Sequence, residues 1–375
     1  MDPIKKKIFE ESGRIVIKIG SSLITDTSKG LINKPSLNNI VNEIASLLGK
    51  GKEIVVVSSG AVALGKKTLK IMHKNLKLSE KQAAASVGQV MLINAWKTAF
   101  SKLKISCGQI LLTHFDTENR RSALNARNTF EALMKSGAIP IINENDTVAT
   151  KELKHGDNDQ LAARVAQIFS ADLLIILSDI EGLYSSNPKR KKDAKLFDKV
   201  YNVSKNIEKM SENTSSIYSV GGMQTKIKAA KISLAIGCHM IITKGTGKSP
   251  INNLIKGKKA TWFISKISPK SARKSWISAQ LKINGSITVD SGAEKALING
   301  ASLLPAGILS ISGNFDKGDI INVFNVKKKV ICTGITAYPA NEAKIIAGAK
   351  SDEIEKLLGY HSKDVVIHRD DMVIR

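Results

Sequence analysis

Two short runs of the sequence concentrate acidic and amide side chains that could bind a polar ligand. Residues 143–146 read Asn-Glu-Asn-Asp and residues 156–159 read Gly-Asp-Asn-Asp, in a chain whose formal net charge is +24. The first run follows an apolar stretch, Ala138–Ile142, which is typical of a buried strand. Ligands of open parallel sheets bind at the carboxyl ends of strands. An Asx-rich turn would explain one run alone, but two runs in the same connection favour a ligand site.

Lys18 lies within an otherwise apolar strand pattern, Arg14–Ile19, where an unpaired ammonium group is costly to desolvate. We therefore expect it to meet an anion or to lie at the carboxyl edge of the sheet. Gly20, Ser21 and Ser22 follow it and suit a turn whose backbone N–H groups approach a phosphate. The alternative is an edge lysine whose ammonium group extends into solvent.

Three further turns have groups that attract anions or cations. Ser58–Ala61 places hydroxyls and N–H groups at a helix N-terminus, although an ordinary serine N-cap would look the same. Gly221–Lys226 puts a lysine in a first helical turn, where it opposes the helix dipole unless an anion lies between them. Ser178 and Asp179 end another apolar strand and could hold a nucleotide or its Mg²⁺. Together these groups suit phosphoryl transfer, in which catalysis is mainly positioning and charge stabilisation.

One motif is misleading. Gly245–Ser249 resembles the end of a P-loop, but the glycine that should begin the motif is replaced by Ile242, inside a strand pattern. No Gly-x-Gly-x-x-Gly follows the first strand either. A nucleotide site in this chain would therefore need another architecture.

Length and composition predict a globular protein with two domains. The 375 residues exceed a typical single domain, and 42% hydrophobic with 24% charged residues is a globular composition. No window approaches the ~18 apolar residues of a membrane span, and three scattered cysteines favour a reduced, cytoplasmic protein. The 57 lysines and arginines against 33 acids could attract nucleic acid, membranes or small anions. They are spread along the chain, so a solvated basic surface is the preferred interpretation.

Apolar, β-branched runs alternate with helical patterns along the first two thirds of the chain. This alternation predicts an α/β domain with an open, mostly parallel sheet sandwiched by helices. The predicted strands are Arg14–Ile19, Glu53–Val57, Ile105–Leu112, Ala138–Ile142, Leu173–Leu177 and His239–Thr243, and the predicted helices are Ser36–Leu48, Lys81–Leu103, Asn119–Lys135, Asp157–Phe169 and Met223–Ile236.

The character of the sequence changes after Phe263. Residues Ser265–Ser275 are rich in lysine and serine, contain Pro269 and lack periodicity, which is typical of a linker. Short strand patterns follow, with one helix near Ser291–Asn299. We therefore predict a catalytic domain over residues 1–264, a linker over 265–275 and a small, mainly β domain over 276–375.

These motifs, in this order, resemble the glutamate 5-kinase family, whose members have an amino-acid-kinase fold followed by a PUA domain. The resemblance covers nearly the whole chain. It rests on Ile17–Ser21, Ser59–Gly65, Leu124–Arg127, Ile141–Thr150, Gly156–Asp159, Glu181–Tyr184 and Gly221–Met223 in the first domain, and on Ile287–Ala293, Ser302–Pro305, Gly313–Phe315 and His368–Met372 in the second.

The resemblance implies ATP-dependent phosphorylation of the L-glutamate γ-carboxylate, the first step towards proline, with Mg²⁺ carried by ATP and no residue directly assigned to the metal. Lys18 and Lys226 would stabilise the transferring phosphoryl group, and Asp159 would hold their ammonium groups in place. The residues implied to bind glutamate are Ser59, Asp146 and Asn158, with Asp157 as a further contact to its amino group. Those implied to contact ATP are Lys18, Ser178, Asp179, Val220, Gly221, Gly222, Met223, Gln224, Thr225 and Lys226.

Three positions depart from the family pattern. Ser178 stands where the family usually has threonine, which keeps the hydroxyl. Val220 stands where threonine is commoner, and Ser219 replaces a usual glycine. Nucleotide affinity is the property that these last two changes would affect.

The resemblance also implies partners. Family members form dimers and tetramers, proline feedback would act at the glutamate site and the loop beyond Asn145, here including Thr150–His155, and glutamyl phosphate reductase would be a pathway partner. The nearest alternative is another amino-acid-kinase-fold enzyme, acting on acetylglutamate, aspartate, carbamate or UMP, but the Gly-Asp-Asn-Asp run and the second domain argue against it. An RNA-binding protein is the alternative from another class, since PUA domains elsewhere contact RNA, but the second domain has no aromatic-rich basic stripe.

Overall fold

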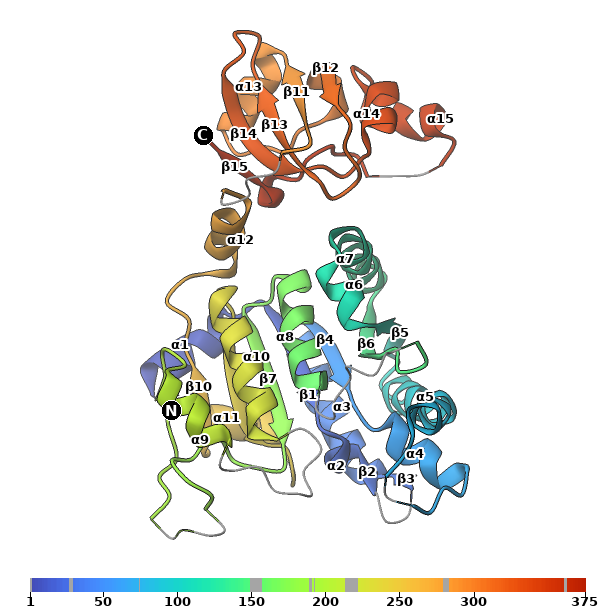
Figure 1. The fold of residues 1–375 in the computed structure, drawn as a ribbon, viewed down its shortest axis with the longest axis vertical. Coiled ribbons are helices and arrows are strands. Elements are labelled where there is room, and N and C mark those ends of the chain that lie inside the picture. The colour runs from blue at the N-terminus through green and yellow to red at the C-terminus, as the bar shows by residue number, and fades with distance from the viewer. Residues whose placement is uncertain are drawn as a thin grey trace. The chain divides into compact units, whose positions relative to one another are not determined.

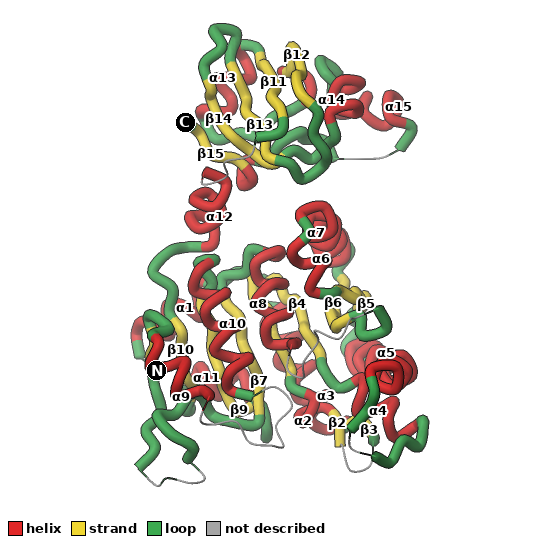
Figure 2. The backbone as a smooth tube through the Cα atoms, in the orientation of Figure 1, coloured by secondary structure: helices red, strands yellow, loops and turns green. Residues whose placement is uncertain are grey.

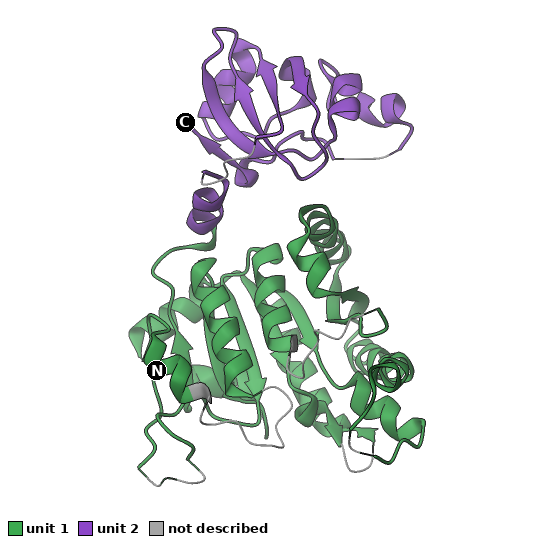
Figure 3. Cartoon of the chain, viewed as in Figure 1, with its two compact units in different colours: residues 1–269 green, residues 270–375 purple. Residues whose placement is uncertain are grey.

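The chain forms two compact units, Met1–Pro269 and Lys270–Arg375 (Figure 3). Each unit has its own main sheet and its own hydrophobic core. The computed structural model describes residues 2–26, 30–73, 75–148, 157–188, 191, 193–212, 222–278, 283–360 and 363–375.

Unit 1 is built on an eight-stranded sheet with the strand order β5-β6-β4-β1-β7-β9-β10-β8 (Figure 2). Neighbouring strands are parallel except for β9 and β10, which pair antiparallel. The predicted open, mostly parallel sheet is therefore confirmed. Its strands are β1 (Arg14–Ile19), β4 (Glu53–Ser58), β5 (Ser106–Leu112), β6 (Ala138–Glu144), β7 (Leu173–Ser178), β8 (Lys199–Val200), β9 (His239–Lys244) and β10 (Ala260–Phe263), and a separate short pair is β2 (Thr25–Asp26) with β3 (Leu31–Ile32).

Helices cover both faces of this sheet (Figure 1). Ile15, Ile17 and Ile19 of β1 pack with α3 and α5, whereas Val16 packs with α7, α8 and α10 on the other face. Because side chains alternate along a strand, Lys18 shares the face of Val16. The helices are α1 (Pro3–Glu11), α2 (Ser21–Ile24), α3 (Lys34–Leu48), α4 (Ala61–Thr68), α5 (Leu78–Ser101), α6 (His114–Glu118), α7 (Arg120–Lys135), α8 (Asp157–Phe169), α9 (Lys205–Glu212), α10 (Met223–Ala235) and α11 (Pro250–Ile255).

The strands and helices predicted for unit 1 are all present, with ends that differ by three residues at most. Helix α3 shows the reason for one such difference. It begins two residues earlier than predicted because the Asn33 side chain caps it, accepting from the Ser36 N–H at 3.2 Å, and Pro35 fits its first turn. Among the described residues, no helix has both the length and the apolar character that crossing a membrane would require.

Unit 2 contains a five-stranded sheet with the order β12-β11-β13-β14-β15, as expected for a small, mainly β domain. The expectation of a single helix in this part of the chain is wrong, because two more α-helices follow α13. They have only seven and five residues, too few for hydrophobic periodicity to reveal. The elements are β11 (Gly285–Val289), α13 (Ser291–Ile298), β12 (Ile308–Gly313), β13 (Ile320–Phe324), β14 (Val330–Ile335), α14 (Ala340–Ile346), α15 (Ile354–Leu358) and β15 (Met372–Ile374), with 3₁₀ turns at Pro305–Gly307, Ser351–Glu353 and Arg369–Asp371.

The segment predicted as a linker also contains a helix, α12 (Pro269–Ser278). Its Ile277 is fully buried against apolar residues of β13, β14 and β15. Its Arg273 guanidinium forms an ion pair with Asp371 at 2.7 Å. The lysine-rich and serine-rich composition does not predict this packing, because one buried isoleucine is too weak a pattern to distinguish a helix from a loop.

Candidate functional site

Three charged side chains from three elements of unit 1 meet near the carboxyl end of β1. Lys18 of β1 and Lys226 in the first turn of α10 both approach Asp159 in the first turn of α8. The Lys18 Nζ lies 2.7 Å from Asp159 Oδ1, and the Lys226 Nζ lies 3.0 Å from Asp159 Oδ2. The exposed fractions are 7% for Lys18, 4% for Lys226 and 0% for Asp159. One buried carboxylate therefore joins two buried ammonium groups, and the interpretation of Lys18 as a solvent-extended edge lysine is wrong.

The charges of this cluster do not cancel. Burial alone would raise the pKa of Asp159, but the charges of Lys18 and Lys226 outweigh it and hold that pKa at about 2. Burial lowers the pKa of Lys18, and the charge of Lys226 lowers it further, against the opposing effect of Asp159. The three side chains carry two cationic groups for one carboxylate, and the Asp179 carboxylate also acts on Lys18. An anion that approaches the two ammonium groups would be attracted to them.

Thr225 adds a neutral group to the cluster. Its hydroxyl oxygen lies 2.9 Å from Asp159 Oδ2 and 2.8 Å from the Gly222 carbonyl oxygen. One hydroxyl proton can be donated to only one of these acceptors at a time. Sequence analysis predicts an ATP contact for Thr225, and the structure places its hydroxyl beside Asp159.

A second cluster, which we call the amide cluster, consists of Asn158, Ser59, Asn143 and the Ser58 carbonyl group. The Asn158 Nδ2 lies 2.7 Å from the Ser59 Oγ, 3.0 Å from the Asn143 Oδ1 and 3.2 Å from the Ser58 carbonyl oxygen, and its two protons are shared among these three acceptors. The start of α8 is thereby connected to the ends of β4 and β6. The Asn158 Oδ1 is buried and accepts no hydrogen bond from any residue that the structure describes.

Helix α5 supports the amide cluster with two residues that sequence analysis misses. The Gln89 Oε1 accepts a hydrogen bond from the Asn143 Nδ2 at 2.6 Å. The Trp96 Nε1 donates to the Ser58 Oγ at 2.9 Å. Residues seven apart lie on one side of a helix, but this spacing alone does not distinguish the two residues from ordinary positions of a long helix.

The turn after β4 is not an ordinary serine N-cap. Gly60 is the N-cap of α4, and no side chain forms a hydrogen bond with this cap. Its φ of +120° is a conformation that favours glycine, and a Cβ there would lie 2.8 Å from the Thr25 Cγ2. The Ser59 hydroxyl is therefore free of capping and faces Asn158 instead.

Asp146 follows β6 in the first of the two runs of acids and amides. No hydrogen bond or ion pair within the described part of the chain joins it to Asp159 or to the amide cluster. Burial raises the pKa of Asp146 to about 6. A cationic ligand beside this carboxylate would lower its pKa again, so the side chain is suited to bind an ammonium group.

The residues predicted to contact ATP are only partly described. The Ser178 Oγ at the end of β7 donates to the Asp179 Oδ1 at 3.1 Å. Gly222 is the N-cap of α10, and no side chain caps this end of the helix, which suits an anion. Met223 and Gln224 follow in the first turn. The predicted Val220 and Gly221, the unusual Ser219, the side chain of Asp157 and the predicted proline loop, residues 150–155, lie outside the described residues.

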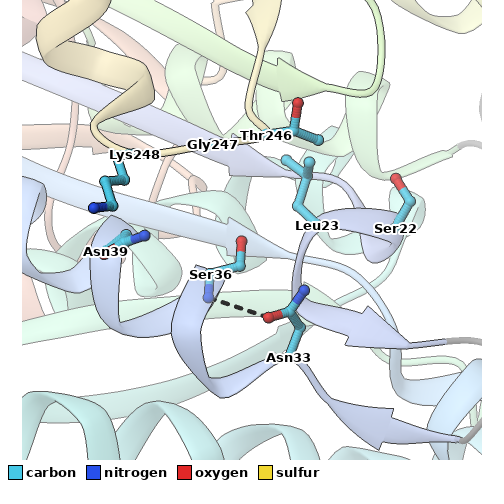
Figure 4. Close-up of a pocket in the computed structure, with 8 residues that line it drawn as sticks. All are labelled: Ser22, Leu23, Asn33, Ser36, Asn39, Thr246, Gly247 and Lys248. Atoms are coloured by element: carbon cyan, nitrogen blue, oxygen red, sulfur yellow. Dashed lines mark hydrogen bonds between the residues drawn. The ribbon is translucent and has the colours of Figure 1, made fainter.

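A separate pocket of about 270 Å³ lies between α2, α3 and the loop after β9 (Figure 4). It contains none of the residues assigned to catalysis, glutamate or ATP, although Ser22 belongs to the turn after β1 that suits a phosphate in the sequence. The P-loop-like stretch of the sequence forms part of its wall. Its lining residues are Ser22, Leu23, Asn33, Ser36, Asn39, Thr246, Gly247 and Lys248.

Comparisons with known proteins cover both units. The profile of the amino acid kinase family matches residues 13–244, and that of the PUA domain matches residues 285–358. The glutamate 5-kinase of Paramagnetospirillum magneticum is 47% identical over 361 residues, which cover 96% of this chain and 97% of the relative. The glutamate 5-kinase of Agrobacterium fabrum is 49% identical over 371 residues, covering 99% and 95%. The structure of carbamate kinase from Giardia lamblia bound to AMP-PNP aligns with a TM-score of 0.49 at 14% identity, covering 68% of this chain and 100% of that one.

Proposed function

The chain belongs to the amino acid kinase family, and from this premise we propose that it transfers the γ-phosphoryl group of ATP to the γ-carboxylate of L-glutamate. The product is L-glutamyl 5-phosphate, and the reaction is the first step of proline biosynthesis. The glutamate 5-kinases that match nearly the whole chain support this substrate. The structural observation that carries the proposal is the pair of buried lysines on Asp159.

The proposed step needs fixed positive charge more than it needs a base. A γ-carboxylate oxygen of glutamate forms a bond to the γ-phosphorus, the bond to the β,γ-bridging oxygen breaks, and ADP leaves with the electron pair. An ionised carboxylate has no proton to remove, so the step needs no general base. Asp159, with its pKa of about 2 and its two ion pairs, fits the role of a holder of lysines.

The size of the charge repulsion shows why the lysines matter. Two like unit charges 4 Å apart repel by about 4 kcal/mol at an effective dielectric constant of about 20. A barrier higher by about 4 kcal/mol would slow the reaction roughly a thousandfold. Lys18 and Lys226 offset this repulsion, and their positions are set before either substrate arrives because Asp159 already holds them.

The glutamate subsite combines a carboxylate with the amide cluster. Asp146 is suited to the substrate ammonium group, because burial raises its pKa and no nearby cation among the described residues lowers it again. Ser59 and Asn158 offer a hydroxyl and an amide that are already linked to each other. We assign glutamate binding to these three residues, with Asp157 at the start of α8 as the further contact.

ATP would lie along the other half of the sheet edge, with its phosphates at Lys18, Lys226 and the start of α10, and with Ser178 and Asp179 at the end of β7. Among the described residues, no three side chains of His, Cys, Asp or Glu are grouped to hold a metal ion. As the family resemblance implies, we assign Mg²⁺ to the phosphates of ATP, which suits an ion that keeps much of its hydration shell. When bound, it would supply further positive charge to the transferring group.

A trapping assay tests the proposed function. Purified protein would be incubated with ATP, Mg²⁺ and one acceptor at a time, and acyl phosphate would be trapped as the hydroxamate. We expect hydroxamate product with L-glutamate and at least a hundredfold less with D-glutamate, acetylglutamate or aspartate. For carbamate and UMP, the release of ADP would be measured instead. Faster turnover of any other acceptor than of L-glutamate would overturn the proposal.

The proposed function also includes the assembly and the regulation of the enzyme. We propose a homo-oligomer, either a dimer or a tetramer, with proline as a feedback inhibitor at the glutamate site and a glutamyl phosphate reductase as the enzyme that consumes the product. The cytoplasmic location stays a prediction from the cysteine pattern. A glutamate titration with and without proline tests the feedback, and superimposable curves would count against it.

A further inference from the structure

The orientation of the Asn158 amide is set by one acceptor that cannot change its role. The Ser58 carbonyl oxygen can only accept, so the Asn158 group 3.2 Å from it must be the NH₂. The hydroxyl of Ser59, in contrast, can donate or accept. With its NH₂ group turned to Ser58, Asn158 directs its Oδ1 elsewhere, and that oxygen is buried without a donor among the described residues.

The orientation of the Asn158 amide also determines the orientation of the Asn143 amide. Because Asn158 donates, Asn143 must present its Oδ1 to it, at 3.0 Å. The Asn143 NH₂ then points the other way and needs an acceptor, because Asn143 is only 2% exposed. The Gln89 Oε1 is that acceptor, at 2.6 Å. Without it, Asn143 would keep a buried unpaired donor, which is unfavourable, or would turn over and oppose Asn158.

The free Asn158 oxygen identifies the part of the substrate that it meets. Glutamate has two carboxylates, which only accept hydrogen bonds, and one ammonium group, which only donates. An unpaired buried acceptor is complementary to the donor and repels the carboxylates. The Asn158 Oδ1 therefore suits the ammonium group, the same group that Asp146 attracts.

We propose that Gln89 is a positioning residue of the glutamate site: through Asn143 it keeps the Asn158 oxygen directed at the substrate ammonium group. This inference rests on the proposed glutamate kinase function. Gln89 lies on α5, outside the two runs of acids and amides, and it touches no substrate in this scheme. It acts by accepting from the Asn143 NH₂, which leaves the Asn143 Oδ1 facing the Asn158 NH₂.

Three variants test the proposal. Gln89→Met has a similar shape and only a weak sulfur acceptor, Gln89→Glu keeps the oxygen acceptor, and Val90→Ala alters the exposed neighbour on the same helix. Initial rates would be measured against glutamate and ATP, and glutarate would serve as a competitive inhibitor that has both carboxylates and no ammonium group. Thermal unfolding would show that each variant is folded, and Gln89→Ala would replace Gln89→Met if that variant does not fold.

In Gln89→Met we expect the KM for glutamate to rise about tenfold, with kcat, the KM for ATP and the glutarate inhibition constant within about twofold of the wild type. Gln89→Glu should stay within about threefold in every constant, and Val90→Ala should match the wild type. An unchanged KM for glutamate in Gln89→Met would overturn the proposal. An equal rise of the inhibition constant of glutarate would also overturn the proposal, because a structural defect of the site would weaken the binding of both ligands. Failure of the wild type to phosphorylate glutamate would instead overturn the proposed function.

Discussion

Asp146 and Asp159 differ in whether a cationic side chain neutralises their charge, and this difference separates their roles. Asp159 holds two lysines, and its pKa is about 2. Asp146 has no such partner among the described residues, and its pKa is about 6. A carboxylate that is already paired organises a site, whereas one that lacks a partner is ready to bind a cation.

Replacement of Lys226 by alanine should lower kcat at least a hundredfold and change the KM for glutamate less than threefold. The reason is that the lysine would act on charge that develops in the transition state. Steady-state kinetics measure both constants. Lys228→Ala removes an exposed charge two residues further along α10 and serves as the control. Near-normal turnover in Lys226→Ala would contradict the assigned role.

The raised pKa of Asp146 predicts a pH dependence. In the free enzyme the carboxylate must be ionised to attract the ammonium group, so kcat/KM for glutamate should fall as the pH drops through about 6. The bound ammonium group favours ionisation, so the acidic limb of kcat should lie at a lower pH. Rate profiles from pH 5 to pH 8 measure both limbs. An acidic limb near pH 6 that persists in Asp146→Asn would assign the titration to another group.

The raised pKa of Asp146 also means that the ligand-free protein loses stability as the pH rises. The pKa of Asp146 in the folded protein, about 6, lies above its ordinary value of 3.8, so the ionised side chain destabilises the ligand-free fold. The cost is absent well below pH 3.8, grows as the pH rises towards 6 and is complete above it. Asp146→Asn should therefore unfold at a higher temperature than the wild type at pH 7.5, although it binds glutamate poorly.

Residues with strong local signals can be predicted from the sequence, whereas residues that act through packing cannot. Lys18 is visible because a charge interrupts an apolar strand, and Asp159 because it ends a run of acids and amides. Their roles stay predictions. Gln89 and Trp96 look like ordinary positions of a long helix until β4 and β6 are placed beside it. Their contacts span more than 35 residues of sequence, which no local pattern encodes.

At the scale of elements, the close crossing of α4 and α5 positions the amide cluster. A Cβ on Gly65 would lie 1.7 Å from the Ala84 carbonyl oxygen, and one on Gly88 would lie 1.8 Å from the Ala61 carbonyl oxygen. Two helices can approach this closely only because both positions lack side chains. Helix α4 begins directly after Ser59 and Gly60, and α5 presents Gln89, so the crossing fixes both sides of the cluster.

Gly65→Ala should destabilise the protein by more than 2 kcal/mol, although alanine is the better helix former by about 1 kcal/mol. Overpacking against backbone atoms typically costs 1–3 kcal/mol and is worse where the neighbour cannot move. Urea unfolding measures the change. Gly49→Ala is the matched control, because its Cβ would have no neighbour nearer than 3.5 Å, and it should be neutral or slightly stabilising. A neutral Gly65→Ala would mean that the helices can separate without cost.

Long and regular helices and strands can be predicted from the sequence more completely than short ones. The buried strands of unit 1 have β-branched residues on both faces, so they are recognisable without any knowledge of their neighbours. Helix α12 and the short helix α14 pack on the sheet of unit 2, and α15 packs on α14. Their sequences contain too few turns for a period of 3.6 residues to emerge.

At the scale of the whole molecule, the excess of positive charge belongs to unit 1. Residues 1–269 contain 42 lysines and arginines against 22 acids, whereas residues 270–375 contain 15 against 11. A strongly basic unit 1 would attract the anionic substrates that we assign to it. The small excess in unit 2 gives no support to the RNA-binding alternative, which would draw on phosphate contacts from that unit.

Unit 2 should depend on α12 for its stability. Ile277→Ala in the full chain should destabilise unit 2 by about 2–4 kcal/mol, because it removes a fully buried side chain. Hydrogen exchange would then be faster in β13 and β14 and unchanged in β1 and β7. Ser275→Ala, at an exposed position of the same helix, should leave all four strands unchanged. Faster exchange in β1 as well would show that the two units do not unfold independently.

The hydrogen bond from Trp96 to Ser58 places an indole ring one residue from the Ser59 hydroxyl. Indole fluorescence depends on the polarity and hydrogen bonding around the ring, and the chain has three tryptophans. With Trp262 and Trp276 replaced by phenylalanine, the remaining indole emission would come from Trp96 alone. Arrival of a ligand at the amide cluster could then be followed optically, on the millisecond scale and without ATP, so that binding is recorded separately from chemistry.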